Sequence, residues 1–226
     1  MFSEQLPNLV VWALLWGLSW GFFFLYLSKR IDYVKHFIWT GTYFLLVAVI
    51  TAFVFQDYIV RALSDFTIAP LIVLGFATIL HVLLYVFIHK YLQEPKDYFV
   101  RYPKRQYLQV DLRRLFSKSM DILSQQVFVL LLIMFLQDAG LTTGQIIITF
   151  AVIFGMIHAP LILIERGTWS SWYFTIFSIL SAIIFPILII KIQYGFVYSY
   201  IVHWIFYTFT AVGFWIWYNK HREKIY

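Results

Sequence analysis

Seven of the polar or ionisable side chains within the apolar stretches of this chain have types that could support chemistry. They are three histidines, two glutamines, one aspartate and one tyrosine: His81, Asp121, Gln125, Gln126, His158, His203 and Tyr207. A polar group surrounded by hydrocarbon needs a hydrogen-bonding partner or water, so such residues are rare in membrane segments and mark functional sites by default. The imidazoles and the carboxylate could transfer protons, and the amides could form hydrogen bonds between helices.

The spacing of these residues predicts that several of them meet. Asp121 and Gln125 are four residues apart, as are His203 and Tyr207, so each pair shares one face of a helix. The glutamine pair lies roughly 10 Å beyond the predicted cytoplasmic start of its helix, at 1.5 Å per residue, and His158 lies at a similar depth. We therefore expect one water-containing cavity, open to the cytoplasm, that satisfies these groups together.

Three stretches resemble the motifs of the CPBP family of intramembrane proteases, which includes the CAAX prenyl proteases and bacteriocin-processing or Abi-like immunity proteins. The family motifs are EExxxR, FxxxH and HxxxN or HxxxD, in that order on core helices. The matching stretches read Gln125-Gln126-Val-Phe-Val-Leu130, Phe154-Gly-Met-Ile-His158 and His203-Trp-Ile-Phe-Tyr207. The resemblance covers about residues 115–218 and implies a cytoplasm-facing catalytic cavity with the two histidines at its centre.

Departures from these motifs bear on catalysis. The family is thought to activate water with a glutamate, which Gln125 and Gln126 replace, and Tyr207 stands where the family has Asn or Asp. A glutamine amide does not accept a proton near neutral pH, and losing a general base typically costs about 10²–10⁴-fold in rate. The resemblance therefore implies a pseudoenzyme or a weakened protease, unless His158 serves as the base or Asp121 supplies the missing carboxylate.

Each of these residues also has a purely structural interpretation. His81 matches no motif, and we expect it only to hydrogen-bond to a neighbour, as His158 and His203 could also do. The glutamine pair could hold helices together, and Asp121 could be a solvated acid at the start of its helix. We expect no cofactor, because a metal held by His158 and His203 would lack a third good protein ligand.

The elements that position these residues are seven apolar runs of 18 to 23 residues, each long enough to cross a hydrocarbon layer of about 30 Å as a helix. The runs are 7–27, 36–55, 67–88, 119–136, 143–164, 169–190 and about 196–218. Fifteen of the 17 Lys and Arg residues fall in alternate gaps between them, and only Arg61 and Lys191 fall in the others. This asymmetry predicts an N-terminus outside and a cytoplasmic C-terminus.

Composition excludes several classes of protein. With 62% hydrophobic and 12% charged residues and a mean hydropathy of +0.79, the chain predicts an all-α, multi-pass membrane protein, which we expect in the cell membrane. The net charge of +6 lies at predicted membrane borders, so it indicates contact with lipid headgroups and no nucleic-acid partner. The chain has no cysteine, which excludes thiolate chemistry. Tryptophans such as Trp12, Trp16 and Trp20 lie within the predicted spans or at their ends, and we expect aromatic residues to form interface belts as well as core.

The basic segment 89–118 is the one sizeable polar stretch, and it predicts three parts of one membrane domain. These are a three-helix part (1–88), a cytoplasmic loop (89–118) and a four-helix CPBP-like core (119–226). Within the loop, 105–118 could form a short helix lying along the membrane surface. The segment could be a gate or a partner-binding loop, or only a connector that follows the charge topology.

Three hypotheses about function follow. The first is a divergent CPBP-type protein that binds a membrane-bound or lipid-modified peptide, with proteolysis weakened or lost. The second is a non-enzymatic membrane protein, such as a small-molecule transporter or a binding or scaffold subunit; transporters usually show repeated halves, which this sequence lacks. The third is a lipid-modifying enzyme that uses the histidines, although no acidic metal-binding motif supports it.

Overall fold

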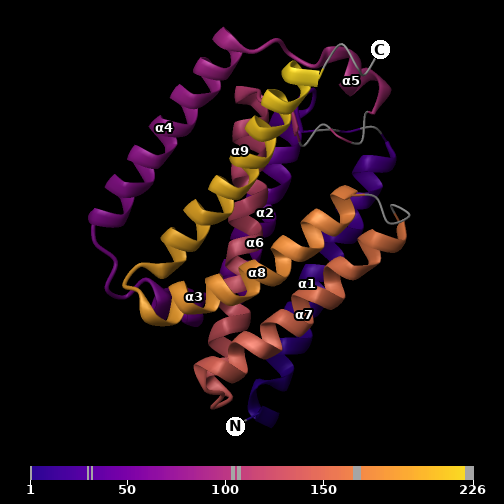
Figure 1. Cartoon of the computed structure of the whole chain (residues 1–226). Coiled ribbons are helices and arrows are strands. Elements are labelled where there is room, and N and C mark those ends of the chain that lie inside the picture. The colour runs from indigo at the N-terminus through magenta and orange to yellow at the C-terminus, as the bar shows by residue number, and fades with distance from the viewer. Residues whose placement is uncertain are drawn as a thin grey trace.

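The computed structural model describes residues 2–29, 31, 33–102, 105, 108–164 and 169–221. In this part of the chain all regular secondary structure is helical (Figure 1). The elements are α1 (Phe2–Ser28), α2 (Phe37–Val54), α3 (Gln56–Ala62), α4 (Ala69–Tyr91), α5 (Lys96–Arg101), α6 (Leu112–Asp138), α7 (Thr143–Ile164), α8 (Trp169–Lys191) and α9 (Gly195–His221).

The seven long helices occupy the seven predicted apolar runs, and the prediction of an all-α, multi-pass membrane protein is confirmed. Six of them, α1, α2, α4, α6, α8 and α9, are long and apolar enough to cross a membrane. The helix α7 follows the fifth predicted run, and its described stretch Thr143–Met156 forms a shorter apolar helix. Figure 1 shows α5 and the end of α9 at the end of the bundle opposite the N-terminus, where the alternate-gap charges place the cytoplasm.

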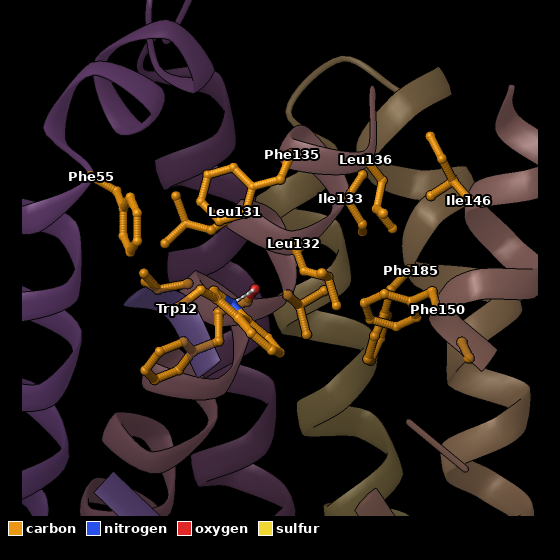
Figure 2. Packing of buried hydrophobic residues seen from close by; sticks show 14 of the residues in the cluster. Trp12, Phe55, Leu131, Leu132, Ile133, Phe135, Leu136, Ile146, Phe150 and Phe185 are labelled. Carbon is orange, nitrogen blue, oxygen red and sulfur yellow. Dashed lines mark hydrogen bonds between the residues drawn. The ribbon is translucent and has the colours of Figure 1, made fainter. Parts of the chain in front are cut away.

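The helix α6 is the axis of the bundle. About 78% of its most apolar stretch is buried, compared with 11% for α1 and for α4, and it packs on α1, α2, α7, α8 and α9. Figure 2 shows Leu132 of α6 between Trp12 and Phe55 on one side and Phe150 and Phe185 on the other. A residue on α6 therefore faces protein in most directions, which is where a polar side chain can find partners.

The start of α6 differs from the prediction. The helix begins at Leu112, seven residues before the expected border at 119, so 112–118 is not part of a separate surface helix. Asp111 caps it, because its carboxylate accepts a hydrogen bond of 2.7 Å from the backbone N–H of Arg113. Partial burial alone would raise the pKa of Asp111, but the hydrogen bonds from Arg113 outweigh it and lower that pKa. The short α-helix in the described part of the basic segment is α5.

This early start also changes the division of the domain. The boundary predicted at 118–119 falls inside α6, and one of the two most extensive helix–helix contacts, between α2 and α6, crosses it. A helix of 27 residues is about 40 Å long, so α6 is longer than a hydrocarbon layer of about 30 Å is thick.

Candidate functional site

A buried carboxylate near the start of α6 organises the first group of polar side chains. Asp121 is fully buried and accepts three hydrogen bonds: 2.6 Å from Lys118 Nζ, 2.7 Å from Gln125 Nε2 and 2.9 Å from the Tyr33 hydroxyl. Gln125 lies one turn further along α6, as the four-residue spacing predicted. The interpretation of Asp121 as a solvated acid at a helix start is therefore wrong, because α6 begins two turns earlier and buries it.

Sequence reasoning missed Lys118. Its side chain is 8% exposed, its Nζ pairs with Asp121, and the same atom lies 3.8 Å from the centre of the Tyr207 ring. The charge count had assigned every lysine before 119 to the membrane border. The spacing of Lys118 and Asp121, three residues apart, was the available signal, because such residues are neighbours on a helix face. A buried cation that touches both a carboxylate and an aromatic face is well compensated.

The second group surrounds Gln126, whose side chain is fully buried. Its Nε2 lies 3.0 Å from His203 Nδ1, and its Oε1 accepts a hydrogen bond of 2.8 Å from the Ser199 hydroxyl. Ser199 precedes His203 by four residues and shares its face of α9, which is the signal that could have identified it. Gln126 therefore links α6 to α9 through both of its amide atoms.

Tyr207 joins the two groups. Its ring stacks on the His203 imidazole with 5.3 Å between ring centres, and it also faces the Lys118 ammonium group. The adjacent residues Gln125 and Gln126 thus belong to different hydrogen-bond networks that meet at one aromatic ring. His203 lies within electrostatic range of Lys118, Asp121 and His158.

His158 belongs to a third group. Its Nδ1 lies 2.8 Å from the Phe154 carbonyl of its own helix, and its ring stacks on the Phe154 ring at 5.7 Å. His158 and Gln125 line one cavity of about 280 Å³ between α1, α6 and α7. The other lining residues are mostly aromatic: Trp12, Trp16, Trp20, Phe24, Phe128, Val129 and Phe154. His203 and Tyr207 do not line it.

The tryptophans of α1 form one wall of this cavity. Trp12 is buried, its indole N–H donates a hydrogen bond of 2.9 Å to the Phe128 carbonyl of α6, and its ring stacks on Trp16 at 6.0 Å. The sequence suggested interface or core positions for these tryptophans and no binding role. The signal for a wall was their spacing, because Trp12, Trp16 and Trp20 recur every four residues along one face.

His81 lies apart from all three groups. Its Nδ1 lies 2.7 Å from the Ala77 carbonyl of its own helix, and its ring meets the edge of Trp204. No group of three or more metal-ligating side chains gathers in the described part of the chain.

Few side chains in the cavity wall could take part in a reaction. Gln125 can donate and accept hydrogen bonds but does not act as a base, and Asp121 accepts three donors and does not line the cavity. Among the described lining residues His158 is the one with an acid–base side chain. The site is an aromatic chamber with one amide and one imidazole in its wall.

Comparison with known proteins adds no relative: no protein-family model, no curated protein and no solved structure matches the chain. The resemblance to the CPBP family therefore rests on the three quoted stretches.

Proposed function

We propose that this chain is a divergent, CPBP-like membrane protein whose cavity between α1, α6 and α7 binds the lipid chain of a membrane-associated or prenylated peptide. Peptide-bond hydrolysis is weakened or lost in this proposal. The observation that carries it is that Gln125 and His158, from two of the motif-like stretches, line one aromatic cavity in the bundle.

The size and lining of the cavity support a lipid chain as the occupant. A volume of about 280 Å³ is near the lower end of small-molecule pockets, which span about 300–1,000 Å³. It suits an apolar chain better than a folded segment of peptide. Aromatic walls cover the apolar surface of such a chain. The Gln125 amide and the His158 imidazole can hydrogen-bond the polar residue to which the chain is attached.

The proposal that hydrolysis is weakened depends on which carboxylates could act as a general base. In the family a glutamate activates the attacking water, and here the position that lines the cavity is Gln125. The nearest carboxylate, Asp121, is held by an ammonium, a phenol and an amide, so its oxygen atoms are already occupied. Without a positioned base the expected loss of rate is about 10²–10⁴-fold.

Photocrosslinking tests the binding. A farnesylated peptide that carries a diazirine in its prenyl chain is irradiated with the protein in lipid nanodiscs. The protein is then digested, and the fragments of it that carry the label are identified by mass spectrometry. We expect label on α1 around Trp16 and on α6 around Phe128, and competition by the unlabelled farnesylated peptide but not by its unprenylated form.

A matched pair of variants makes this test specific. Trp16→Ala removes part of the cavity wall and should reduce labelling, whereas Trp39→Ala, at a tryptophan on α2 that is 76% exposed, should not. Label spread evenly over the lipid-facing surfaces, or equal labelling of the two variants, would overturn the proposal.

A further inference from the structure

A second and larger cavity is lined by α5, α8 and the C-terminal half of α9. Figure 1 shows α5 and the end of α9 at the same end of the bundle. The volume of this cavity is about 620 Å³. It shares no lining residue with the cavity that contains Gln125 and His158, and its walls come from α5, the segment after it, α8 and α9. The proposed function makes no use of it.

The walls are aromatic along their length. On α9 the residues Phe209, Gly213 and Trp217 recur every four positions and present one continuous face to the cavity. Tyr98 of α5 and Phe174 of α8 face it from other sides. Such a surface matches the acyl chain of a lipid, because it is apolar and long in one direction.

One charge accompanies this apolar surface. Arg105, from the segment after α5, is the charged residue among the described lining residues. The segment around it carries further positive charge at Lys96 and Arg101, and the positive-inside asymmetry places this end of the bundle in the cytoplasm. The cytoplasmic leaflet is the one that holds anionic lipids in most membranes, and each basic residue near it contributes about 1 kcal/mol of attraction.

We propose that this cavity binds an anionic phospholipid of the adjacent leaflet. The guanidinium of Arg105 contacts the phosphate, and an acyl chain lies along the Phe209–Trp217 face of α9. The polar pair between Tyr173 and Thr210, whose hydroxyl oxygens are 2.9 Å apart, closes the lining between α8 and α9.

The absence of cysteine from the chain allows a direct test. Gly213 lines the cavity, and a Cβ atom added there meets nothing within 4 Å, so Gly213→Cys places a single thiol in the cavity without a clash. Ile216→Cys is the matched control, because Ile216 lies on the same helix three residues away, is 53% exposed and does not line the cavity. The rate of reaction with N-ethylmaleimide is measured for both variants in nanodiscs.

We expect phosphatidylglycerol, added to phosphatidylcholine nanodiscs, to slow labelling of Gly213→Cys several-fold and to leave Ile216→Cys unchanged. Adding Arg105→Gln should reduce the preference for phosphatidylglycerol about fivefold, the ratio that corresponds to about 1 kcal/mol at one basic residue. Arg101→Gln, in the same basic segment but outside the lining, should reduce the preference less than Arg105→Gln does.

Three outcomes would overturn the proposal. Equal slowing of both thiols would mean that the lipid acts on the reagent and not on the cavity. Protection by phosphatidylcholine alone, unaffected by Arg105→Gln, would exclude recognition of the anionic headgroup. Protection by oleate added to phosphatidylcholine nanodiscs, without protection by phosphatidylglycerol, would assign the cavity to a free fatty acid. The variants are compared only where their thermal unfolding matches that of the parent protein.

Discussion

Lys118 Nζ lies 2.6 Å from Asp121 Oδ2, and both side chains are buried in the first turns of the central helix. Removing two charges from water is costly, so the pair persists because further partners share the compensation: Tyr33 and Gln125 donate to the carboxylate, and Tyr207 faces the ammonium. This pair fixes the position of Gln125, the glutamine that lines the smaller cavity.

The first prediction concerns this pair. Lys118→Met should destabilise the protein by about 3–5 kcal/mol, because it leaves the Asp121 carboxylate buried without a counter-ion. Lys118→Met combined with Asp121→Asn should be less destabilised than Lys118→Met alone, since no unpaired charge then remains. The free energy of unfolding is measured by titration with dodecyl sulfate in mixed micelles, followed by loss of helicity.

The exposed pair between Arg61 and Asp138 is the control for this measurement. Arg61 Nη2 lies 2.9 Å from Asp138 Oδ2, but the two side chains are 52% and 29% exposed. Arg61→Gln should therefore lower the free energy of unfolding by at most about 1 kcal/mol. Equal losses for Arg61→Gln and Lys118→Met would contradict the picture of a buried, mutually dependent network.

The second prediction moves the carboxylate into the cavity. Gln125→Glu alone should destabilise the protein, because the new carboxylate faces Asp121 where an amide now donates at 2.7 Å. Combining Gln125→Glu with Asp121→Asn restores a donor and an acceptor at this contact and keeps the net charge. Of these two variants, we expect the exchange variant to fold and to gain cleavage of a fluorogenic prenylated peptide.

Gln126→Glu is the companion variant. Its carboxylate would face His203 and the Ser199 hydroxyl, two groups that can donate to it, so the protein should remain folded. It does not line the cavity with His158, and we expect it to gain less activity than the exchange variant. An exchange variant that folds normally and shows no cleavage would count against a protease-like site.

The third prediction concerns pH and Tyr33, which lies in the loop between α1 and α2. Burial raises the pKa of the Tyr33 phenol well above its usual value near 10, and the neighbouring Asp121 carboxylate raises that pKa further. A group whose pKa is raised on folding stabilises the folded state fully below its ordinary pKa, and this contribution is lost as the pH rises through the folded pKa. The stability that Tyr33 adds should therefore be constant at neutral pH and decline only above about pH 10.

Tyr33→Phe provides the measurement. The hydrogen bond to a charged carboxylate is worth about 1.5–3 kcal/mol, so Tyr33→Phe should lower the free energy of unfolding by that amount at neutral pH. The difference between Tyr33→Phe and the parent protein should shrink in strong alkali. A difference that grows with rising pH would have the wrong sign for a hydrogen-bonded, un-ionised phenol.

The helices could be predicted from the sequence more accurately than their contacts. The run predicted at 36–55 is the helix 37–54, and that at 169–190 is the helix 169–191, because the thickness of the bilayer sets the length of an apolar run and polar residues mark its ends. The sequence did not predict the start of α6. Charge counting assigns basic residues such as Lys118 to the membrane border, and it takes no account of the Asp111 cap, at which the helix begins before Lys118.

The partners of the polar residues were only partly predictable. Spacing of four residues placed Asp121 beside Gln125 and His203 beside Tyr207, because these contacts are local. Tyr33 lies 88 residues from Asp121 in the sequence, and no periodicity reports such a contact. The sequence also could not show that Gln125 and Gln126 enter different networks, because neighbouring positions on a helix point about 100° apart and tertiary packing decides what each one meets.

The last prediction separates the two motif histidines. His203→Ala removes the partner of the buried Gln126 amide, so it should destabilise the protein by about 1–3 kcal/mol, the cost of an unsatisfied buried polar group. His158→Ala should cost less stability, because the His158 imidazole hydrogen-bonds to a carbonyl of its own helix, yet it should reduce crosslinking of the farnesylated probe, since His158 lines the cavity.

His81→Ala is the matched control for both histidine variants. Its imidazole also bonds to a carbonyl of its own helix, and it belongs to neither network, so we expect it to change probe crosslinking least of the three. Free energies of unfolding and crosslinking yields are measured side by side for the three alanine variants. If His203→Ala were to lower crosslinking as strongly as His158→Ala without any loss of stability, then His203 would act directly on the bound chain, and the separation of the two histidines into a structural network and a cavity wall would be wrong.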